Sequence, residues 1–470
     1  MEKNYRNVCE VIVKNDFCVG CGICAGICPV HVLEMKLNKY GEYQPVEIKK
    51  GCLPKCDLCF RGCPFWNQVD NEDSLAKGAF GNESVIKHRN ETGYYIDSFV
   101  GYSKVDGHRA NGASGGMATW LLETLFTEGF VDHIICVTHN PEPGKLYKFS
   151  VINSIEEIRS ASRSCYYPVE LSAVIDYILT HEGQYAIIGL PCFLKGIRLA
   201  SRTSVKLKRR ITYLLGLVCG QLKSTFFSQY LCALRGGDPK SMDYCQFRIK
   251  DSEREANDFG FSFNCTKGNI KSGTVFWKEG MREVWTNGFF KLNACNFCDD
   301  IFAELADVVF MDAWIDPYIY DSKGTNIVLC RNKNLSEIFS SGKTNGNIHF
   351  DDLPIEKVIK SQQAVIDIKR KQLAQRLRLS KMVDQKYFPQ KRIKPSVFCP
   401  IILFERFLER RVVNSSKQVM SRFGINETIT NVENETSFSL FVLALIGGIR
   451  NRLSVSYIRR QINRLRSIFS

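Results

Sequence analysis

Long hydrophobic runs are absent from this sequence of 470 residues. The N-terminal segment Met1–Glu10 is polar and lacks the apolar core of a secretory signal peptide. The most apolar stretch near the other end, Ser437–Ile449, is shorter than the roughly 20 residues that a membrane-spanning helix needs. We therefore expect a cytoplasmic protein whose thiols stay reduced and can bind metal.

Acidic residues are under-represented, since 49 Asp and Glu stand against 63 Lys and Arg and leave a formal net charge of +14. This excess does not predict a nucleic-acid partner, because no nucleic-acid-binding module is recognisable and the basic residues are not interleaved with aromatic ones in a compact domain. Much of the excess lies in residues 351–470, a basic tail with expected helices at Ile368–Leu379 and Tyr457–Arg466. We favour a tail packed on the body over one that contacts a membrane surface or an acidic partner.

Cysteine, by contrast, is abundant, with 20 residues. The first run is Cys18, Cys21, Cys24 and Cys28 followed by Pro29, and it reads C-x2-C-x2-C-x3-C-P. This is the spacing of bacterial ferredoxins, whose thiolates bind [4Fe-4S] clusters. A second run consists of Cys52, Cys56, Cys59 and Cys63 followed by Pro64, and it departs from the pattern by one extra residue between its first two cysteines.

The two runs together predict two [4Fe-4S] clusters, because each run of a two-cluster ferredoxin lends its fourth cysteine to the other cluster. One set would be Cys18, Cys21, Cys24 and Cys63, and the other Cys28, Cys52, Cys56 and Cys59. The alternatives are a zinc site or a disulfide knot, but zinc sites rarely use eight cysteines in two C-x3-C-P runs. The stretch closely resembles a bacterial-type ferredoxin domain.

Strand-like apolar segments alternate with helical ones after the cysteine runs, which predicts a sheet with parallel strands. Two of these segments end at Cys192 and Cys219, so both cysteines are expected at the carboxyl edge of the sheet, where ligands bind. Cys295 and Cys298 add a C-x2-C pair. Four thiolates are the number that one further [4Fe-4S] cluster requires.

A turn of small residues, Ser114-Gly115-Gly116, precedes an apolar helix. We expect Ser114 to cap this helix. The unpaired amides at such a helix start suit a phosphate group, although a plain capped helix with glycines for close packing explains the local sequence about as well. His108 in the preceding loop and Cys165 beside the expected site are weaker functional candidates, and His133 is expected to be structural.

Four motifs follow one another along the chain: Ser114-Gly115-Gly116, Gly189-Leu190-Pro191-Cys192, Leu217-Val218-Cys219-Gly220, and Cys295-x2-Cys298-x-Asp300 with Glu304-x-Ala306-Asp307. From about Val100 to Cys330, the set resembles the coenzyme F420-reducing hydrogenase/dehydrogenase beta-subunit family. One departure is Phe193, which stands where the family often has Gln after the Pro-Cys pair.

The resemblance implies a flavoprotein that passes electrons between iron-sulfur clusters and FAD, and then to a two-electron acceptor. It also implies that Cys192, Cys219, Cys295 and Cys298 ligate a third cluster. The turn Ser114-Gly115-Gly116 would form part of the flavin site.

We expect a multidomain fold of α+β and α/β type. A small ferredoxin-like iron-sulfur module would be followed by an α/β flavin and iron-sulfur domain and a mostly helical tail. The expected boundaries are 1–68 for the ferredoxin domain, 69–93 for a linker, 94–182 and 183–350 for the two halves of the family-like region, and 351–470 for the tail. Expected strands include Val8–Val13, His31–Met35, Gln184–Leu190 and Ile211–Val218.

The expected function is that of an iron-sulfur flavoprotein oxidoreductase. Electrons would pass from the ferredoxin-type clusters through a third cluster to FAD and on to an organic two-electron acceptor. The alternatives are a non-catalytic electron-transfer subunit that serves a partner enzyme and a redox sensor without flavin. An electron-donor protein or partner redox subunit and a small-molecule substrate are the expected partners. The sequence identifies no catalytic residue.

Overall fold

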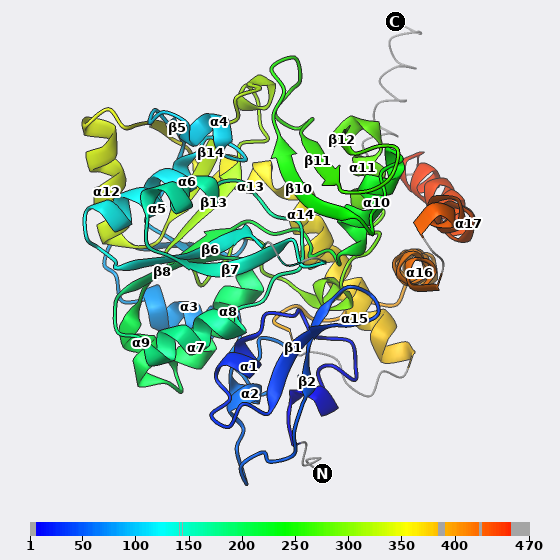
Figure 1. The fold of residues 1–470 in the computed structure, drawn as a ribbon, viewed down its shortest axis with the longest axis horizontal. Coiled ribbons are helices and arrows are strands. Elements are labelled where there is room, and N and C mark those ends of the chain that lie inside the picture. Colours follow the sequence, from blue (N-terminus) through cyan, green and yellow to red (C-terminus); the bar gives the residue numbers. More distant parts are fainter. Residues whose placement is uncertain (1–5, 141, 143, 384–390, 423–424, 453–470) are drawn as a thin grey trace, which may run out of the picture.

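The structure is a computed structural model that describes residues 6–140, 142, 144–383, 391–422 and 425–452. It is a mixed α/β multidomain fold with small N-terminal sheets, a central eight-stranded sheet and a helical C-terminal end (Figure 1), which confirms the expected fold class. The expected helix at Tyr457–Arg466 lies outside the described residues.

The N-terminal module is a small two-stranded sheet surrounded by short helices and loops. The strands β1 (Leu33–Leu37) and β2 (Tyr43–Glu47) pair antiparallel. The strand predicted at Val8–Val13 is wrong, because the chain forms a 3-10 helix, η1 (Val8–Glu10), whose first turn is capped by the Asn7 side chain accepting from the Cys9 amide at 3.0 Å. The helices are α1 (Ile23–Gly26) and α2 (Leu58–Arg61).

The segment expected to be a linker contains regular structure. Asn71 accepts a hydrogen bond from the Ser74 amide and so starts helix α3 (Glu72–Phe80). A short hairpin of β3 (Lys87–Arg89) and β4 (Gly93–Tyr95) follows and leads into the central domain.

The central sheet has the strand order β15-β5-β14-β13-β9-β8-β6-β7. Its middle four strands, β13, β9, β8 and β6, pair parallel with one another, while the outer strands pair antiparallel. The bounds are β5 (Asp97–Ser103), β6 (His133–His139), β7 (Tyr147–Ile152), β8 (Tyr185–Gly189), β9 (Ile211–Leu217), β13 (Val308–Asp312), β14 (Asn326–Cys330) and β15 (Ile348–Asp352).

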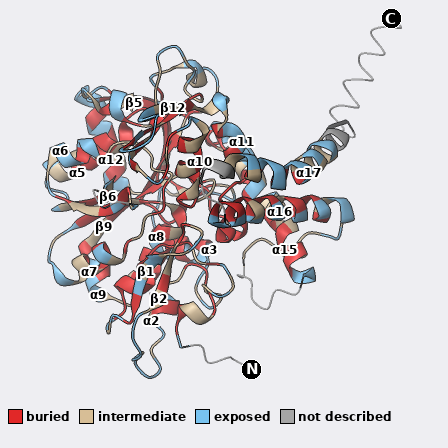
Figure 2. Ribbon diagram, turned by 45° about the vertical axis from the view of Figure 1, so that its right-hand side comes forward, coloured by how far each residue is buried: buried red, intermediate tan, exposed pale blue. Residues whose placement is uncertain are grey.

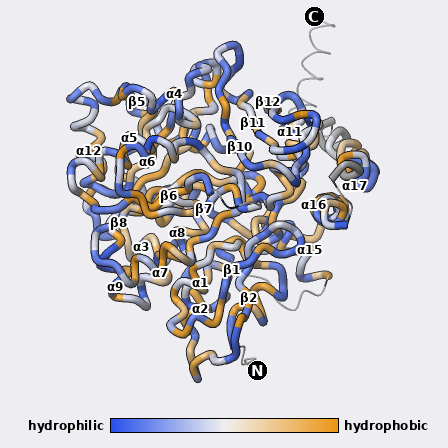
Figure 3. The backbone as a smooth tube through the Cα atoms, in the orientation of Figure 1, coloured by the Kyte–Doolittle hydropathy of each residue, from blue (hydrophilic) through white to orange (hydrophobic). Residues whose placement is uncertain are grey.

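Helices cover both faces of this sheet and separate two apolar cores (Figure 1). One face packs against α5 (Met117–Thr127), α6 (Ile155–Ser160) and α12 (Lys333–Thr344), with the short α4 (His108–Asn111) before them. The other packs against α7 (Ser172–Thr180), α8 (Pro191–Ser201) and α9 (Val205–Arg210). Hydrophobic residues concentrate in strands such as β6 (Figure 3), and these strands are buried (Figure 2).

A second, three-stranded antiparallel sheet carries an aromatic core of its own. It consists of β10 (Met242–Ile249), β11 (Gly260–Cys265) and β12 (Ser272–Phe276), and it packs with α10 (Phe226–Leu234), α11 (Met281–Thr286) and the 3-10 helix η2 (Trp277–Glu279). Two further 3-10 helices, η3 (Asn293–Phe297) and η4 (Tyr318–Tyr320), flank β13.

The C-terminal part is helical and packs on the body. Its helices are α13 (Ile355–Ser361), α14 (Gln363–Ile366), the π-helix η5 (Asp367–Lys371), α15 (Gln372–Met382), α16 (Pro400–Arg422) and α17 (Ile425–Arg452). Lys417 of α16 pairs with Glu42 of the N-terminal module at 2.8 Å. Within the described residues, no helix is long and apolar enough to cross a membrane.

Candidate iron-sulfur and cofactor sites

The first set of predicted ligands surrounds one pocket in the N-terminal module. Cys18, Cys21, Cys24 and Cys63 all line it, together with apolar residues such as Phe17. Burial and, to a smaller extent, the neighbouring Cys63 thiol together raise the pKa of Cys21 to about 12. The Gly20 amide donates to Cys18 Sγ at 3.3 Å. Cys21 and Cys24 are buried and Cys18 and Cys63 half-buried, and four thiols that disfavour one another's ionisation are a donor set that a cationic iron-sulfur core would stabilise.

The second predicted set is also brought together. Burial raises the pKa of Cys59 to about 12, and Cys56, Cys52 and Cys28 each contribute to the rise. Cys52, which breaks the usual spacing, therefore lies among the other three. Its sulfur accepts from Asn7 Nδ2 at 3.9 Å.

No group of three or more His, Cys, Asp or Glu side chains in the described part of the chain is arranged to hold a single metal ion. A [4Fe-4S] cluster is not held in that way, because each of its thiolate ligands binds a different iron and the sulfurs surround a cube rather than a point.

The third set lies at the carboxyl edge of the central sheet. The strands β8 and β9 are parallel neighbours in which Gly189 pairs with Gly216, and Cys192 and Cys219 follow these glycines. Cys295 lies in η3 and Cys298 directly after it. Burial raises the pKa of Cys192 well above its usual value, and the thiols of Cys298, Cys219 and Cys295 raise it further. The four predicted ligands therefore lie within electrostatic range of one another.

Sequence reasoning missed Lys369, which reaches this third set from η5. Its ammonium lies 3.2 Å from Cys298 Sγ and donates to the Asp300 carbonyl at 2.8 Å. Lys369 is 2% exposed, and although burial lowers its pKa, the Cys298, Cys219 and Cys295 thiols outweigh burial and raise it. One signal was present: Ile366, Lys369 and Leu373 follow helical spacing, so the lysine lies on the apolar stripe of its helix.

The first and third thiol sets are neighbours across the contact between the N-terminal module and α8. The Cys21 thiol also contributes to the raised pKa of Cys192, after burial and the three thiols of its own set. At Gly196 of α8 a Cβ would lie 3.0 Å from Ile23 Cγ1 and 3.3 Å from the Gly62 carbonyl. The module therefore rests directly on the helix that begins at Cys192 (Figure 1).

The small-residue turn differs from its prediction in one respect. Gly116, with φ +77°, occupies the N-cap position, whereas the Ser114 hydroxyl donates to the Thr325 carbonyl at 2.7 Å. Asn326 Oδ1 accepts from the Met117 amide at 3.1 Å and so replaces the expected serine cap. Ser114 was wrongly expected to cap the helix, because its hydroxyl donates instead to the carbonyl of Thr325, a residue distant in the sequence that directly precedes β14.

Close packing explains Gly115. A Cβ at this position would lie 2.6 Å from the Gly101 carbonyl and 2.8 Å from the Asn326 amide nitrogen. The turn is therefore pressed against β5 and β14, at the same sheet edge as Asp312 at the end of β13. Close packing therefore explains why position 115 is a glycine. The neighbouring residue Ser114 lines a pocket that a ligand could enter.

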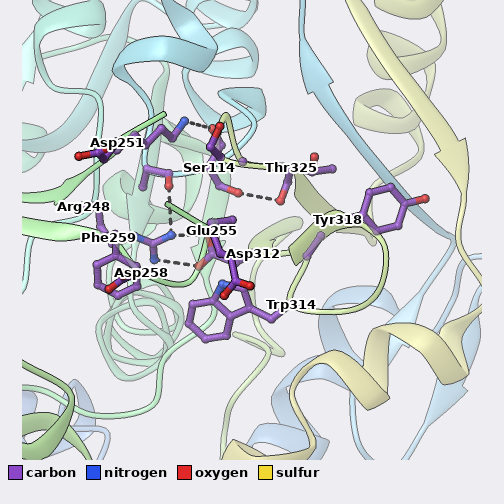
Figure 4. Close-up of a pocket in the computed structure, with 16 residues that line it drawn as sticks. Ser114, Arg248, Asp251, Glu255, Asp258, Phe259, Asp312, Trp314, Tyr318 and Thr325 are labelled. Atoms are coloured by element: carbon purple, nitrogen blue, oxygen red, sulfur yellow. Dashed lines mark hydrogen bonds and ion pairs between the residues drawn. The ribbon is translucent and has the colours of Figure 1, made fainter. Parts of the chain in front are cut away.

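A pocket of about 370 Å³, part of it open to solvent, lies beside Ser114 (Figure 4). Buried Arg248 dominates it, since its guanidinium pairs with Asp312 at 2.6 Å and donates to the Ala113 carbonyl at 3.0 Å. Arg248 Nε has no hydrogen-bond partner within the described chain. The same guanidinium lies over the Phe259 ring, 4.1 Å from its centroid. The lining is polar and of mixed charge, because the carboxylates of Asp251, Glu255, Asp258 and Asp312 stand beside Arg248 and Lys250.

Lys250 holds the turn beside this pocket. Its ammonium donates to the carbonyls of Ser114 at 2.7 Å, Arg109 at 2.5 Å and Lys323 at 2.6 Å. Burial and the nearby Arg248 and Arg109 lower the pKa of Lys250 to about 7. Three carbonyl acceptors favour the charged amine, so the ammonium cross-links the turn to its neighbouring loops.

Tyr166 interacts with both the pocket residue Arg248 and a cysteine of the third thiol set. Its hydroxyl accepts from Arg248 at 3.3 Å. Burial raises the pKa of Tyr166, and the Asp312 carboxylate and Cys219 thiol add to the rise while Arg248 opposes it. Tyr166 therefore contacts a residue of the pocket and lies within electrostatic range of Cys219.

The weaker candidates have structural partners. His108 is 2% exposed, and its ring nitrogens lie 2.9 Å from Glu123 Oε2 and 3.1 Å from Ser103 Oγ. His133 Nδ1 lies 2.5 Å from Asn153 Oδ1. Burial and then Cys245 raise the pKa of Cys165 well above its usual value, so it is a poor nucleophile near neutral pH.

A ferredoxin-type cysteine run docked on a mixed α/β domain characterises an iron-sulfur redox protein. Residues 98–176 and 183–356 match the N-terminal and C-terminal regions of the coenzyme F420 hydrogenase/dehydrogenase beta subunit, and residues 11–34 match a 4Fe-4S binding domain. The chain belongs to this beta-subunit family and carries an N-terminal 4Fe-4S ferredoxin domain.

Similar proteins include two from Methanocaldococcus jannaschii and one of known structure from Methanosarcina barkeri. A coenzyme F420-dependent sulfite reductase of Methanocaldococcus jannaschii is 24% identical over 316 residues, which are 63% of this chain but 42% of that protein. An uncharacterized protein of the same organism is 20% identical over 79% of this chain and 98% of its own length. A chain of the F420-reducing [NiFe] hydrogenase complex from Methanosarcina barkeri shares the fold, with a TM-score of 0.50 and 18% identity over 65% of this chain and 99% of that one.

Proposed function

We propose that this protein is an iron-sulfur flavoprotein oxidoreductase. Electrons would pass from two ferredoxin-type [4Fe-4S] clusters through a third cluster to FAD, and from there to an organic two-electron acceptor. One observation supports the proposal: the Cys21 thiol of the first set acts electrostatically on Cys192 of the third, and Tyr166, which accepts from Arg248 in the pocket at Ser114, is acted on by Cys219 of the third set. When bound, the clusters supply one-electron transfer and the flavin converts single electrons into pairs.

The residues would divide the work as follows. Three sets of four cysteines hold the clusters: Cys18, Cys21, Cys24 and Cys63; Cys28, Cys52, Cys56 and Cys59; and Cys192, Cys219, Cys295 and Cys298. The flavin would lie along Ser114-Gly115-Gly116, where Arg248 offers charge to its phosphates and Phe259 and Trp314 offer aromatic faces. The ferredoxin unit corresponds to residues 1–68, and the flavin and third-cluster unit to residues 94–350.

The alternative is a non-catalytic electron-transfer subunit. It is favoured by the structural likeness to a chain of a hydrogenase complex, in which such a chain has partner subunits. In either case we propose a cytoplasmic protein that receives electrons from a donor protein or a partner redox subunit.

Anaerobic purification followed by iron, sulfide and flavin analysis tests the cofactor content. Three cubane clusters require about twelve iron and twelve sulfide per chain, together with one FAD. Cys192→Ser should lose about four of these iron atoms and keep the ferredoxin clusters. Cys399→Ser, which changes a cysteine outside all three sets, is the control and should lose none.

Turnover separates the two functions. The holoprotein reduced with dithionite should reoxidise on addition of small organic two-electron acceptors if it is the enzyme. A fully loaded protein that exchanges electrons only with a partner protein would favour the subunit alternative. Iron content unchanged by Cys192→Ser would contradict the third cluster.

A further inference from the structure

The two last helices form an antiparallel hairpin, because only residues 423–424 separate α16 from α17 and the helices pack along each other (Figure 1). Each buries one stripe. On α16 the stripe includes Leu408 and Val412, and on α17 it includes Val432, Thr436 and Ser439. The opposite faces of both helices remain exposed (Figure 2).

The exposed face of each helix changes character halfway along. On α16 it begins with Ile401, Phe404 and Phe407, which are 66%, 48% and 46% exposed. Toward the hairpin turn the same face continues with Arg411, Asn414 and Gln418, which are exposed and polar. The first half of the α16 face is therefore apolar and the second half is polar.

The exposed face of α17 shows the reverse order. It begins with the polar Glu433 and Glu435 and continues with Phe438, Phe441 and Leu445, which are 67%, 63% and 50% exposed. Because the helices are antiparallel, both apolar halves lie at the end of the hairpin away from its turn. We call the six residues Ile401, Phe404, Phe407, Phe438, Phe441 and Leu445 the apolar end.

Large apolar side chains gathered in this way mark an interaction surface rather than an ordinary protein surface. The charge of the adjoining sequence indicates what covers it. From Thr436 to Ser470 the chain contains no Asp or Glu, and it contains the arginines Arg450, Arg452, Arg459, Arg460, Arg464 and Arg466. An anionic surface complements the charge of this segment, whose arginines follow the exposed Leu445 in the sequence, whereas a second copy of the chain carries the same excess of positive charge.

We propose that the apolar end of the α16–α17 hairpin docks on an anionic lipid bilayer. The phenylalanine and leucine side chains would enter the headgroup boundary while the arginines bind the lipid phosphates. Apolar burial and basic charge are the two signals that stable peripheral binding requires. The contact would be peripheral, since no described helix is able to span the bilayer. The proposal does not depend on the identity of the redox cofactors.

Vesicle sedimentation with the anaerobically purified full chain tests the proposal. Wild type should sediment with vesicles in which part of the phosphatidylcholine is replaced by phosphatidylglycerol, and much less with pure phosphatidylcholine. Added salt should weaken the binding, because it screens the electrostatic attraction between the arginines and the lipid phosphates. The triple variant Phe438→Ser, Phe441→Ser, Leu445→Ser should bind anionic vesicles at least about tenfold more weakly.

Two further variants sharpen the test. Asn414→Ser with Gln418→Ser changes the polar half of the same hairpin and should leave binding unchanged. Arg450→Gln with Arg452→Gln should reduce the preference for anionic over neutral vesicles without changing the circular dichroism spectrum. Equal binding of wild type and the triple variant would overturn the proposal. Light scattering gives a second way to overturn the proposal. If the wild type is a dimer and the triple variant is a monomer, the apolar end binds a second copy of the chain and not a lipid bilayer.

Discussion

Lys369 shows how a single residue can belong to a site without any motif. A buried ammonium is unfavourable unless negative groups face it, and here the thiols of the third set provide them. Because Lys369 donates directly to Cys298 Sγ, its charge acts on the group that would carry the cluster. Hydrogen bonds and net charge at the sulfurs are among the factors that set the potential of such clusters.

Replacing Lys369 by Met should lower the midpoint potential of the third cluster. The reduced cluster carries one more negative charge than the oxidised one, so a nearby cation stabilises the reduced form. Lys369→Arg should keep most of the wild-type potential. An anaerobic redox titration followed by EPR measures the shift, and Lys371→Met, at a position whose side chain is 72% exposed, is the control. If Lys369→Met retains the third cluster and its midpoint potential is unchanged, Lys369 does not set that potential.

The buried pair of Glu72 and Lys195 fixes α3 to α8, with Nζ and Oε1 3.1 Å apart and both side chains 6% exposed. Glu72→Gln should lower the free energy of unfolding by about 3 kcal/mol, because Lys195 keeps a buried charge without its partner. Urea unfolding at pH 7 measures the loss. Glu83→Gln, at an exposed position on the surface after α3, should have almost no effect.

This pair also predicts a pH dependence. Burial alone would raise the pKa of Glu72, but Lys195, Lys391 and Arg392 outweigh burial and lower it. A carboxylate with a lowered pKa stabilises the fold above its unfolded pKa of about 4.3 and loses that contribution as the pH falls further. The stability difference between wild type and Glu72→Gln should therefore shrink below about pH 4. A difference that stays constant with pH would refute the ionised pair.

At the scale of elements, the turn before α5 depends on a glycine that has no room for a side chain. Gly115→Ala would bring Cβ to 2.6 Å from the Gly101 carbonyl, which belongs to backbone and cannot rotate away. The substitution should cost about 1–3 kcal/mol and should weaken flavin retention, because the turn borders the pocket. Thermal unfolding and flavin content measure both effects.

Gly78→Ala is the matched control for this substitution. Gly78 lies inside α3, and a Cβ there would meet nothing within 4 Å. Alanine in a helix interior is favoured over glycine by up to about 1 kcal/mol, so this variant should be equally or more stable than wild type. Destabilisation by both variants would indicate that the packing at Gly115 is not the cause.

The same scale shows what the sequence could predict. The strands expected at Gln184–Leu190 and Ile211–Val218 appear as Tyr185–Gly189 and Ile211–Leu217, because continuous apolar runs identify buried parallel strands. The convergence of Cys192 and Cys219 followed from that topology alone. Local patterns failed where a distant group decides the outcome, as at Ser114, whose hydroxyl donates to Thr325 across the sheet edge.

Lys369 was missed for a related reason. Its partner Cys298 lies 71 positions earlier in the chain, and the π-helix that turns the lysine toward it has no clear local signature. The expected strand at Val8–Val13 failed differently: four of its six residues are apolar and β-branched, but the Asn7 side chain starts a 3-10 turn instead. The β-strand propensity of a segment predicts its structure poorly where a side chain can cap a helical turn at its start.

At the scale of the whole molecule, the decisive feature is the fit of the N-terminal module against α7 and α8. A Cβ at Gly26 would lie 2.8 Å from Ile175 Cβ, and one at Gly196 would lie 3.0 Å from Ile23 Cγ1. Glycines on both sides of the interface allow the backbones to approach closely. The approach sets the separation between the thiol set around Cys21 and the set around Cys192, and hence the rate of any electron transfer between them.

Gly196→Phe should increase this separation without removing a ligand. Because electron transfer slows steeply with distance, reduction of the flavin through the ferredoxin clusters should slow markedly while iron and flavin contents stay at wild-type levels. Rapid-mixing spectroscopy with a reduced donor protein measures the rate. Gly78→Phe, at a position on α3 where a Cβ would meet nothing within 4 Å and which belongs to none of the cysteine sets, tests whether added bulk alone slows the transfer. An unchanged rate in Gly196→Phe would mean that electrons reach the third cluster without crossing this interface, and entry would then have to occur from the surface near Cys298.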